Sequence, residues 1–314
     1  MNSIVDSADA EAPVRIVAGP TGAGKSALAI ALAVRHGALI ISADSRQVYR
    51  GFDLGTAKPT SAERARVPHE GIDVAAAHER WSAVRWAAAA AASISAAGSR
   101  GQAVLVVGGT GLWLRALIQP LASVPPMDPD RRLAMQATLG AFDTPTLRRW
   151  VETLDPPRAA LGRAQLLRAA EVVLLTGTRL SDHHLAGALR PRLAARWVIV
   201  DPGEALHPRL ATRLDTMLAA GWADEVRALR ATVPADAPAW NSCGYREIRD
   251  WVEGRIEQAA AREAILISTR QYAKRQRTWF RSQLAGESRV LRVDPRDADT
   301  LVRADRWLFD EESP

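Results

Sequence analysis

The fold is decided by residues 14–37, VRIVAGPTGAGKSALAIALAVRHG. An apolar β-branched run at 14–18 precedes a glycine-rich turn, and apolar residues at helical spacing follow, so the stretch predicts a strand, a turn and a helix. The turn at 19–26 reads GPTGAGKS and fits the G-x-x-x-x-G-K-[ST] pattern, whose backbone N–H groups surround an anion. Lys25 supplies an ammonium for phosphate oxygens, and Ser26 a hydroxyl for a phosphate-bound Mg²⁺. The stretch therefore predicts a di- or triphosphate site, without indicating which compound binds.

Four further apolar runs predict the rest of a sheet. They are residues 38–44, 102–111, 196–202 and 290–295. Helical stretches separate them, including 27–37 and the alanine-rich 80–97. Near-continuous apolar strands that alternate with helices are typical of a parallel sheet covered on both faces. We therefore expect an α/β, P-loop NTPase-like core with a parallel sheet flanked by helices.

A helical insertion is expected within this core. The segment VPPMDPD has three prolines in seven residues and marks a boundary. Residues 129–189 then show helical periodicity and little strand character before the apolar runs resume. The predicted organisation is a catalytic core of residues 1–124 and 190–314, with an all-helical domain at 125–189.

Composition excludes several classes of protein. With 314 residues, 47% hydrophobic and 24% charged, the chain is neither disordered nor collagen-like. Cys243 is the only cysteine, which excludes intrachain disulfides and favours a reducing, cytoplasmic compartment. Residues 1–13 lack the features of a signal peptide, and the alanine-rich stretch 86–98 is shorter than a membrane span. We expect a soluble cytoplasmic protein without a membrane partner.

The basic residues are mostly arginine. Of 41 basic side chains only Lys25, Lys58 and Lys274 are lysines. Codon bias explains most of this excess, but a lysine retained against the bias marks a site that needs a compact ammonium. The net charge of +6 and the pI near 10.2 are compatible with a nucleic-acid partner and do not establish one.

Asp44 and Thr110 follow two of the predicted strands. The carboxyl edge of an open α/β sheet faces the ligand crevice, so both residues are expected near the phosphate loop. Asp44 is either a turn or helix cap, or a general base or metal-positioning group. GGTGLW at 108–113 is either a turn that requires glycine conformations or the part of the crevice that carries Thr110.

A basic helix is predicted near the end of the chain, at 268–283. Arg270, Lys274, Arg277 and Arg281 are spaced 4, 3 and 4 residues apart and so share one face. Such a face is often only solvated, but four cations without an intervening acid favour contact with a phosphate backbone.

Taken together, the motifs resemble those of one family, the bacterial tRNA dimethylallyltransferases (tRNA isopentenyltransferases). The resemblance covers almost the whole chain and includes all three lysines. In order, the matching motifs are GPTGAGKS, ADSRQVYRGFDLGTAKP (43–59), VPHEGIDV (67–74), GGTGLW, CGYRE (243–247) and TRQYAKRQRTWFR (269–281). The ordered series is far more specific than any single motif.

The resemblance implies a reaction and a set of site residues. The family transfers a dimethylallyl group from dimethylallyl diphosphate to the exocyclic N6 amine of adenosine 37 of tRNA. The resemblance implies that Asp44, Thr110 and Lys25 are catalytic, and that Mg²⁺ is held near Ser26 through the diphosphate. The implied diphosphate-binding residues are Gly19, Pro20, Thr21, Gly22, Ala23, Gly24, Lys25, Ser26 and Arg213.

The resemblance also implies that the insertion grips the anticodon stem-loop of a tRNA. The sequence has no long heptad repeat or obvious apolar patch that suggests more than a monomer. The implied tRNA-binding residues are Asp44, Ser45, Arg46, Gln47, Thr110, Arg132, Gly244, Tyr245, Arg246, Arg270, Lys274 and Arg277. The sequence departs from the family pattern at Gly162 and Gln165, where the family usually has Asp and Arg. Arg163 or Arg168 could substitute for the missing contact.

Three other functions compete with this interpretation. A P-loop small-molecule kinase would account for the phosphate loop but for neither the insertion nor the basic helix. An isopentenyltransferase acting on free adenine nucleotide would not need the insertion. A non-catalytic tRNA-binding protein would not need Lys25, Ser26, Asp44 and Thr110 together.

Overall fold

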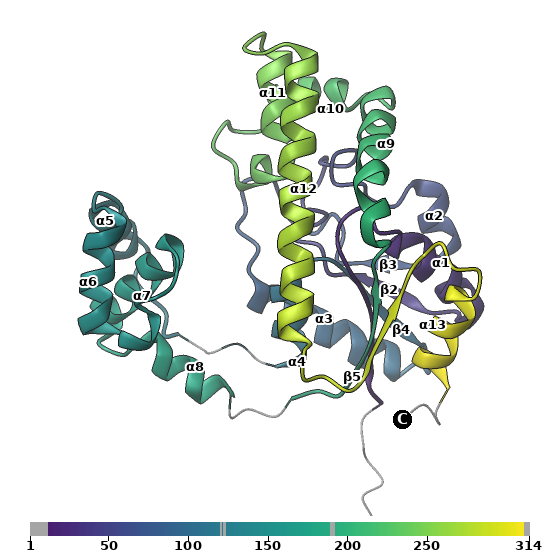
Figure 1. The fold of residues 1–314 in the computed structure, drawn as a ribbon, viewed down its shortest axis with the longest axis horizontal. Helices are drawn as coiled ribbons and strands as arrows, with labels where there is room; N and C mark the ends of the chain where they lie inside the picture. The colour runs from purple at the N-terminus through teal and green to yellow at the C-terminus, as the bar shows by residue number, and fades with distance from the viewer. Residues whose placement is uncertain (1–11, 120, 122–123, 189–191, 311–314) are drawn as a thin grey trace, which may run out of the picture. The chain divides into compact units, whose positions relative to one another are not determined.

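The structure is a computed structural model that describes residues 12–119, 121, 124–188 and 192–310. Most of the polar N-terminal segment that lacks signal-peptide features lies outside the described residues. The chain divides into two compact units. One consists of Met1–Ile118 and Leu193–Pro314, and the other of Gln119–Arg192. Figure 1 shows the ribbon coloured along the chain.

The first unit contains a six-stranded sheet in which every pairing is parallel, in the order β3-β2-β4-β1-β5-β6. The strands are β1 Val14–Ala18, β2 Leu39–Ser42, β3 His69–Glu70, β4 Val104–Gly108, β5 Ala195–Val200 and β6 Val290–Val293. The predicted parallel sheet is confirmed. The sequence did not predict β3, because two residues are too few to show a strand periodicity.

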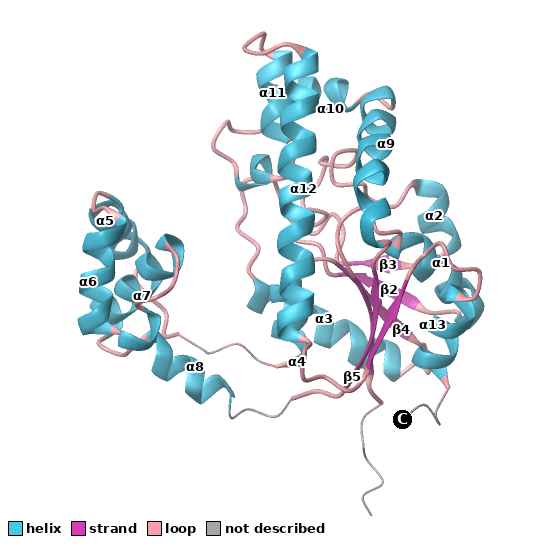
Figure 2. Ribbon diagram, viewed as in Figure 1, coloured by secondary structure: helices cyan, strands magenta, loops and turns pink. Residues whose placement is uncertain are grey.

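Helices cover both faces of this sheet (Figure 2). On one face, α1 (Lys25–His36) and α13 (Thr300–Phe309) pack over an apolar cluster that includes Val17, Leu105 and Val198. Elsewhere on the sheet, α3 (Ala83–Gly98) packs against α4 (Gly111–Ile118), and the rings of Trp86 and Trp113 stack with centroids 5.2 Å apart. Each buried aliphatic side chain stabilises the fold by roughly 1.5–3 kcal/mol.

The connections of the sheet create a crevice. From β1 the chain moves toward the β3 edge of the sheet to form β2. From β4 it moves in the opposite direction, toward the β6 edge, to form β5. In an open parallel sheet, a ligand binds outside the carboxyl ends of strands at such a change of direction. The turns that follow β1 and β4 are therefore the expected position of the site.

Further helices extend beyond the carboxyl edge of the sheet (Figure 1). They are α2 Ser61–Arg66, α9 Leu206–Ala219, α10 Trp222–Arg230, α11 Tyr245–Val252 and α12 Gln258–Gln283, with a short 3-10 turn at Pro238–Asn241. The long helix α12 buries Ile265, Ala273 and Phe280. No helix among the described residues has the length and apolar composition to cross a membrane.

The described residues of the second unit form helices and no strand. Its helices are α5 Pro129–Gly140, α6 Thr144–Leu154, α7 Arg163–Thr176 and α8 Leu180–Ala188, with a 3-10 turn at Pro156–Arg158. Asp128 caps α5 by accepting from the Arg131 N–H at 2.9 Å, and Asp143 caps α6 in the same way. Leu139, Leu147 and Leu166 belong to its separate apolar core.

Candidate active site

The turn after β1 curls back against the sheet. Gly19, Gly22 and Gly24 have φ angles of 147°, 75° and 97°, which favour glycine. A Cβ at Gly19 would lie 2.2 Å from the Val200 carbonyl oxygen, so no side chain fits there. Helix α1 begins directly afterwards at Lys25, and the N–H groups of its first turn lack intrahelical acceptors. This geometry is suited to binding an anion.

Two cations lie beside this turn with one carboxylate. The Lys25 ammonium donates to the Pro20 carbonyl oxygen at 2.7 Å. Burial and then the nearby Arg213 of α9, partly opposed by Asp44, lower the pKa of Lys25 to about 8. Burial also lowers the pKa of Arg213, and Asp44 again opposes the shift. Asp44 alone does not compensate the two buried positive charges, so the site favours an anionic ligand.

Asp44 lies in the turn after β2, which Thr110 helps to hold. One Asp44 oxygen, Oδ1, accepts from the Arg46 backbone N–H at 2.8 Å, so the interpretation as a turn cap is confirmed for that atom. The Thr110 hydroxyl accepts from the Ser45 N–H at 3.1 Å, and the Thr110 N–H donates to the Ala43 carbonyl at 3.2 Å. These bonds tie the turn after β2 to the turn after β4.

A single cavity with a volume of about 140 Å³ joins these groups. Lys25, Ser26, Asp44 and Arg213 line it together. Its apolar lining includes Ile30, Ile40, Leu210, Leu214, Met217 and Ile265. A site with charged groups at one place and aliphatic walls elsewhere suits a small ligand that has an anionic head and a hydrocarbon part.

Helix α12 contributes Tyr272 and Gln276 to the cavity, and the sequence predicted no role for Gln276. Burial, and then the Asp44 carboxylate, raise the pKa of Tyr272 to about 12. The Gln276 side chain accepts from the Thr21 N–H at 2.8 Å and donates to the Gly109 carbonyl at 2.9 Å. The helical spacing could have indicated that Gln276 is buried, because it lies three residues after Ala273 and four before Phe280, on the buried face of the helix.

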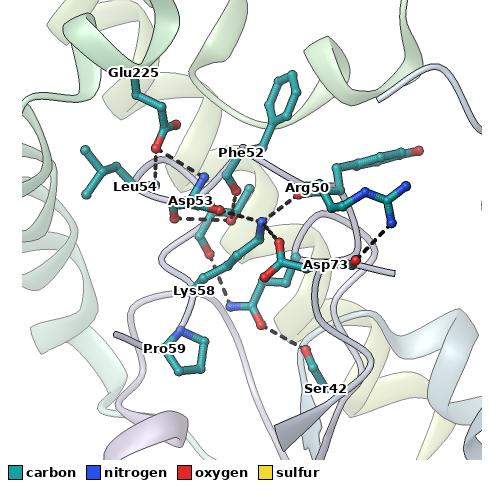
Figure 3. A network of polar contacts seen from close by, with 12 residues as sticks. Ser42, Arg50, Phe52, Asp53, Leu54, Lys58, Pro59, Asp73 and Glu225 are labelled. Carbon is teal, nitrogen blue, oxygen red and sulfur yellow. Dashed lines mark hydrogen bonds and ion pairs between the residues drawn. The ribbon is translucent and has the colours of Figure 1, made fainter. Parts of the chain in front are cut away.

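Lys58 holds the loop that follows Asp44 (Figure 3). Its side chain is 2% exposed, and its ammonium donates to the Tyr49 carbonyl at 2.6 Å, to Asp53 at 2.6 Å and to Asp73 at 2.5 Å. An ammonium has three protons and meets three acceptors here. The site thus requires the compact cation that the retained lysine indicated.

Gln47 supports the same loop. Its amide donates to the Thr56 and Ala57 carbonyl oxygens at 3.3 and 3.0 Å, and its oxygen accepts from the Ser42 hydroxyl at 2.8 Å. The side chain lines the cavity with its polar atoms already engaged.

The positions of Gly244 and Tyr245 correct an expectation. Tyr245 is fully buried, donates to Glu225 at 2.6 Å and accepts from the Gly55 N–H at 3.1 Å. Gly244 has φ 88°, and a Cβ there would lie 2.3 Å from the Trp222 ring. The prediction that the Tyr245 side chain contacts RNA is wrong, because the packing of α10 and α11 covers it.

The basic face of α12 is partly used within the fold. Arg277 donates through Nε to Asp201 at 3.1 Å and also contacts the Gly203 carbonyl. Arg270 and Lys274 are exposed and have no ion pair among the described residues. Arg246, on α11, is exposed and contacts Asn241.

In the helical unit, a buried carboxylate gathers basic side chains. Glu171 is 3% exposed and accepts from Arg132 at 2.7 Å, Arg168 at 2.5 Å and Gln136 at 2.6 Å. Arg163 donates instead to the Gly140 carbonyl at 2.9 Å. Arg163 and Arg168 were the two possible substitutes where the sequence departs from the family pattern. Of these, Arg168 donates to Glu171, as Arg132 does.

Two family models match the chain. The model described as IPP transferase matches residues 47–283, and the model described as isopentenyl transferase matches residues 12–73. The chain belongs to the IPP transferase family.

Relatives and solved structures agree with membership of the IPP transferase family. The chain is 42% identical to a tRNA dimethylallyltransferase of Anaeromyxobacter sp. over 92% of its length and 97% of the relative. It is 42% identical to one of Halorhodospira halophila over 88% and 92%. Its fold matches a Bacillus halodurans tRNA isopentenylpyrophosphate transferase with a TM-score of 0.66 and 30% identity, over 94% and 95% of the two chains. It also matches a eukaryotic dimethylallyltransferase acting on tRNA, with a TM-score of 0.75 and 25% identity, over 90% and 74%.

Proposed function

We propose that this IPP transferase family member transfers a dimethylallyl group from dimethylallyl diphosphate to the N6 amine of adenosine 37 in the anticodon stem-loop of tRNA. The products are N6-(dimethylallyl)adenosine and diphosphate. The observation that carries the proposal is that Lys25, Arg213 and Asp44 line one cavity with aliphatic walls. Two cations suit a diphosphate, the walls suit a five-carbon chain, and the carboxylate suits an amine.

The diphosphate site is the turn from Gly19 to Ser26 with Arg213. Backbone N–H groups and the N-terminus of α1 bind phosphate oxygens, and the two cations offset the charge that develops as the allylic C–O bond breaks. The Ser26 hydroxyl is an oxygen ligand of the kind that Mg²⁺ accepts beside phosphate, so Ser26 would hold the ion through the diphosphate. Mg²⁺ would supply further neutralisation of the leaving group.

Asp44 acts on the attacking amine. As the new C–N bond forms, the amine becomes acidic, so the carboxylate need not be a strong base to take its proton and pass it to water. Oδ1 is engaged with the Arg46 N–H, so the second oxygen is the one available to the amine. Thr110 keeps the Asp44 turn against the end of β4, and we propose that it acts from there beside the point where donor and acceptor meet.

A tRNA substrate is supported by the two sets of basic residues. Arg270 and Lys274 are exposed on α12, and Arg132 and Arg168 share Glu171 on the helical unit. Phosphate contacts of this kind position an RNA without reading its sequence. The target base must leave its stack to enter the cavity, which costs only a few kcal/mol in a single-stranded loop. We infer a monomeric, cytoplasmic enzyme, consistent with one free cysteine, Cys243.

The test measures transfer of labelled dimethylallyl from its diphosphate to an anticodon stem-loop RNA, with Mg²⁺ and without ATP. Asp44→Asn keeps Oδ1 for the Arg46 N–H and removes the base, so kcat should fall about 10²–10⁴-fold. Asp299→Asn, at the N-cap of α13, is the matched control because its carboxylate is 62% exposed and does not line the cavity, and it should keep full activity. Transfer only to free nucleotide, or turnover of ATP without transfer, would overturn the proposal in favour of the corresponding alternative.

A further inference from the structure

Gln276 connects the two turns that flank the crevice. Its carboxamide accepts from Thr21 in the turn after β1, 2.8 Å away, and donates to Gly109 in the turn after β4, 2.9 Å away. The side chain is 7% exposed, so both bonds are shielded from water. Helix α12 thus places one amide group at the point where the sheet changes direction.

The two partners of Gln276 belong to opposite sides of the proposed reaction. Thr21 lies in the turn that presents Lys25 to the leaving diphosphate. Gly109 precedes Thr110, whose hydroxyl holds the turn that carries Asp44. One carboxamide therefore joins the leaving-group side to the acceptor side.

The contact is too close to be incidental. A Cβ at Gly109 would lie 2.3 Å from Gln276 Nε2, so a larger residue there would displace the amide from its present position. A carboxamide offers an acceptor to an N–H and a donor to a carbonyl at the same time, and unlike a carboxyl of the same length it does so without needing to be protonated. Gln276 engages the Thr21 N–H, and the Ala23 N–H donates to the Pro20 carbonyl at 3.3 Å, so the diphosphate would use the remaining N–H groups of the turn.

We propose that Gln276 is a positioning residue that sets the distance between the diphosphate turn and the Asp44 side of the cavity. This inference rests on the proposed function. Alkyl transfer requires the reacting carbon and nitrogen about 3–3.5 Å apart, and a 1 Å displacement can lower a rate by about 10². Gln276 touches neither reacting atom and acts through the two turns.

The first test is Gln276→Met, which keeps the length of the side chain and removes both bonds. The single-turnover rate constant, at saturating dimethylallyl diphosphate and stem-loop RNA, should fall about 10- to 100-fold. RNA affinity should change less than twofold, because Gln276 lies beneath the exposed cations of α12. The matched control is Gln283→Met on the same helix, where the exposed amide oxygen accepts from Arg115 at 2.8 Å, and it should keep the wild-type rate.

A second variant, Gln276→Glu, gives a readout that a loss of folding does not produce. When protonated, the new carboxyl can accept from the Thr21 N–H and donate to the Gly109 carbonyl as the amide does; when ionised, it repels that carbonyl. The ratio of its rate to the wild-type rate should therefore rise as the pH falls. Taking the ratio cancels the titration of the other groups lining the cavity: Lys25, Asp44, His69, Cys243 and Tyr272, beside Arg46 and Arg213.

A wild-type rate in Gln276→Met, or a pH-independent ratio for Gln276→Glu, would overturn the positioning role while leaving the proposed function intact. Absence of transfer by the wild-type chain would overturn the proposed function and this inference with it. A selective loss of rate with pH-dependent recovery supports both.

Discussion

Replacing Lys58 by methionine should destabilise the core unit severely. The ammonium is 2% exposed and serves three acceptors, so its loss strands the Tyr49 carbonyl and leaves Asp73, 29% exposed, with Arg64 alone at 2.8 Å. Breaking a buried ion pair by removing one partner costs about 3–5 kcal/mol. Asp53 is 58% exposed and can be rehydrated, which places the expected loss near the lower limit, about 3 kcal/mol.

The assay is urea unfolding followed by far-UV circular dichroism, with the free energy of unfolding extrapolated to water. The matched control is Arg64→Met, which removes the other cation on Asp73 from a side chain 36% exposed and should cost at most about 1 kcal/mol. Lys58→Arg should not restore stability, because a planar fork does not fit three acceptors placed around an ammonium. A loss below about 1 kcal/mol in Lys58→Met would refute the reasoning.

The same variant changes the dependence of stability on pH. Burial alone would raise the pKa of Asp73, but the hydrogen bonds from Lys58 and Arg64 outweigh it and hold this pKa below its usual range. A carboxyl with a depressed pKa stabilises the fold above the pKa of the unfolded chain, near 3.9, and loses that contribution as the pH falls through its folded value. Without Lys58 the folded pKa of Asp73 moves back towards its unfolded value, so the acid-dependent loss should be smaller and should be complete at a higher pH.

Two further predictions concern charge in the site. Because the pKa of Lys25 is about 8, the affinity for pyrophosphate with Mg²⁺ should fall as the pH rises from 7.5 to 9. Lys25→Met should weaken binding about 10- to 100-fold and remove that dependence; titration calorimetry would show it, and a preserved dependence would contradict the assignment. Arg270→Gln and Lys274→Gln should each reduce the slope of log affinity for stem-loop RNA against log salt by about 0.7–0.9. Arg303→Gln on α13 is the control, and unchanged slopes in the α12 variants would exclude these phosphate contacts.

The sequence predicted which residues lie near the site better than it predicted what each side chain contacts there. Lys25 and Asp44 follow strands whose apolar runs are unmistakable, so their place at the carboxyl edge could be inferred. Tyr245 lies in an equally clear motif, yet its side chain supports the loop at Gly55 from the interior. The amino-acid sequence of a motif does not distinguish an aromatic residue that faces a ligand from one that a neighbouring helix covers.

By itself, the sequence determined what depends on near neighbours along the chain. The glycines of residues 19–24 and the helix that follows create the phosphate turn locally, and the apolar periodicity sets the strands. Only the tertiary structure decided that Arg213 reaches Lys25, and that Gln276 bonds residues 255 and 167 positions away. Such contacts depend on how α9 and α12 pack over the sheet edge, and packing depends on surfaces that many distant residues form together.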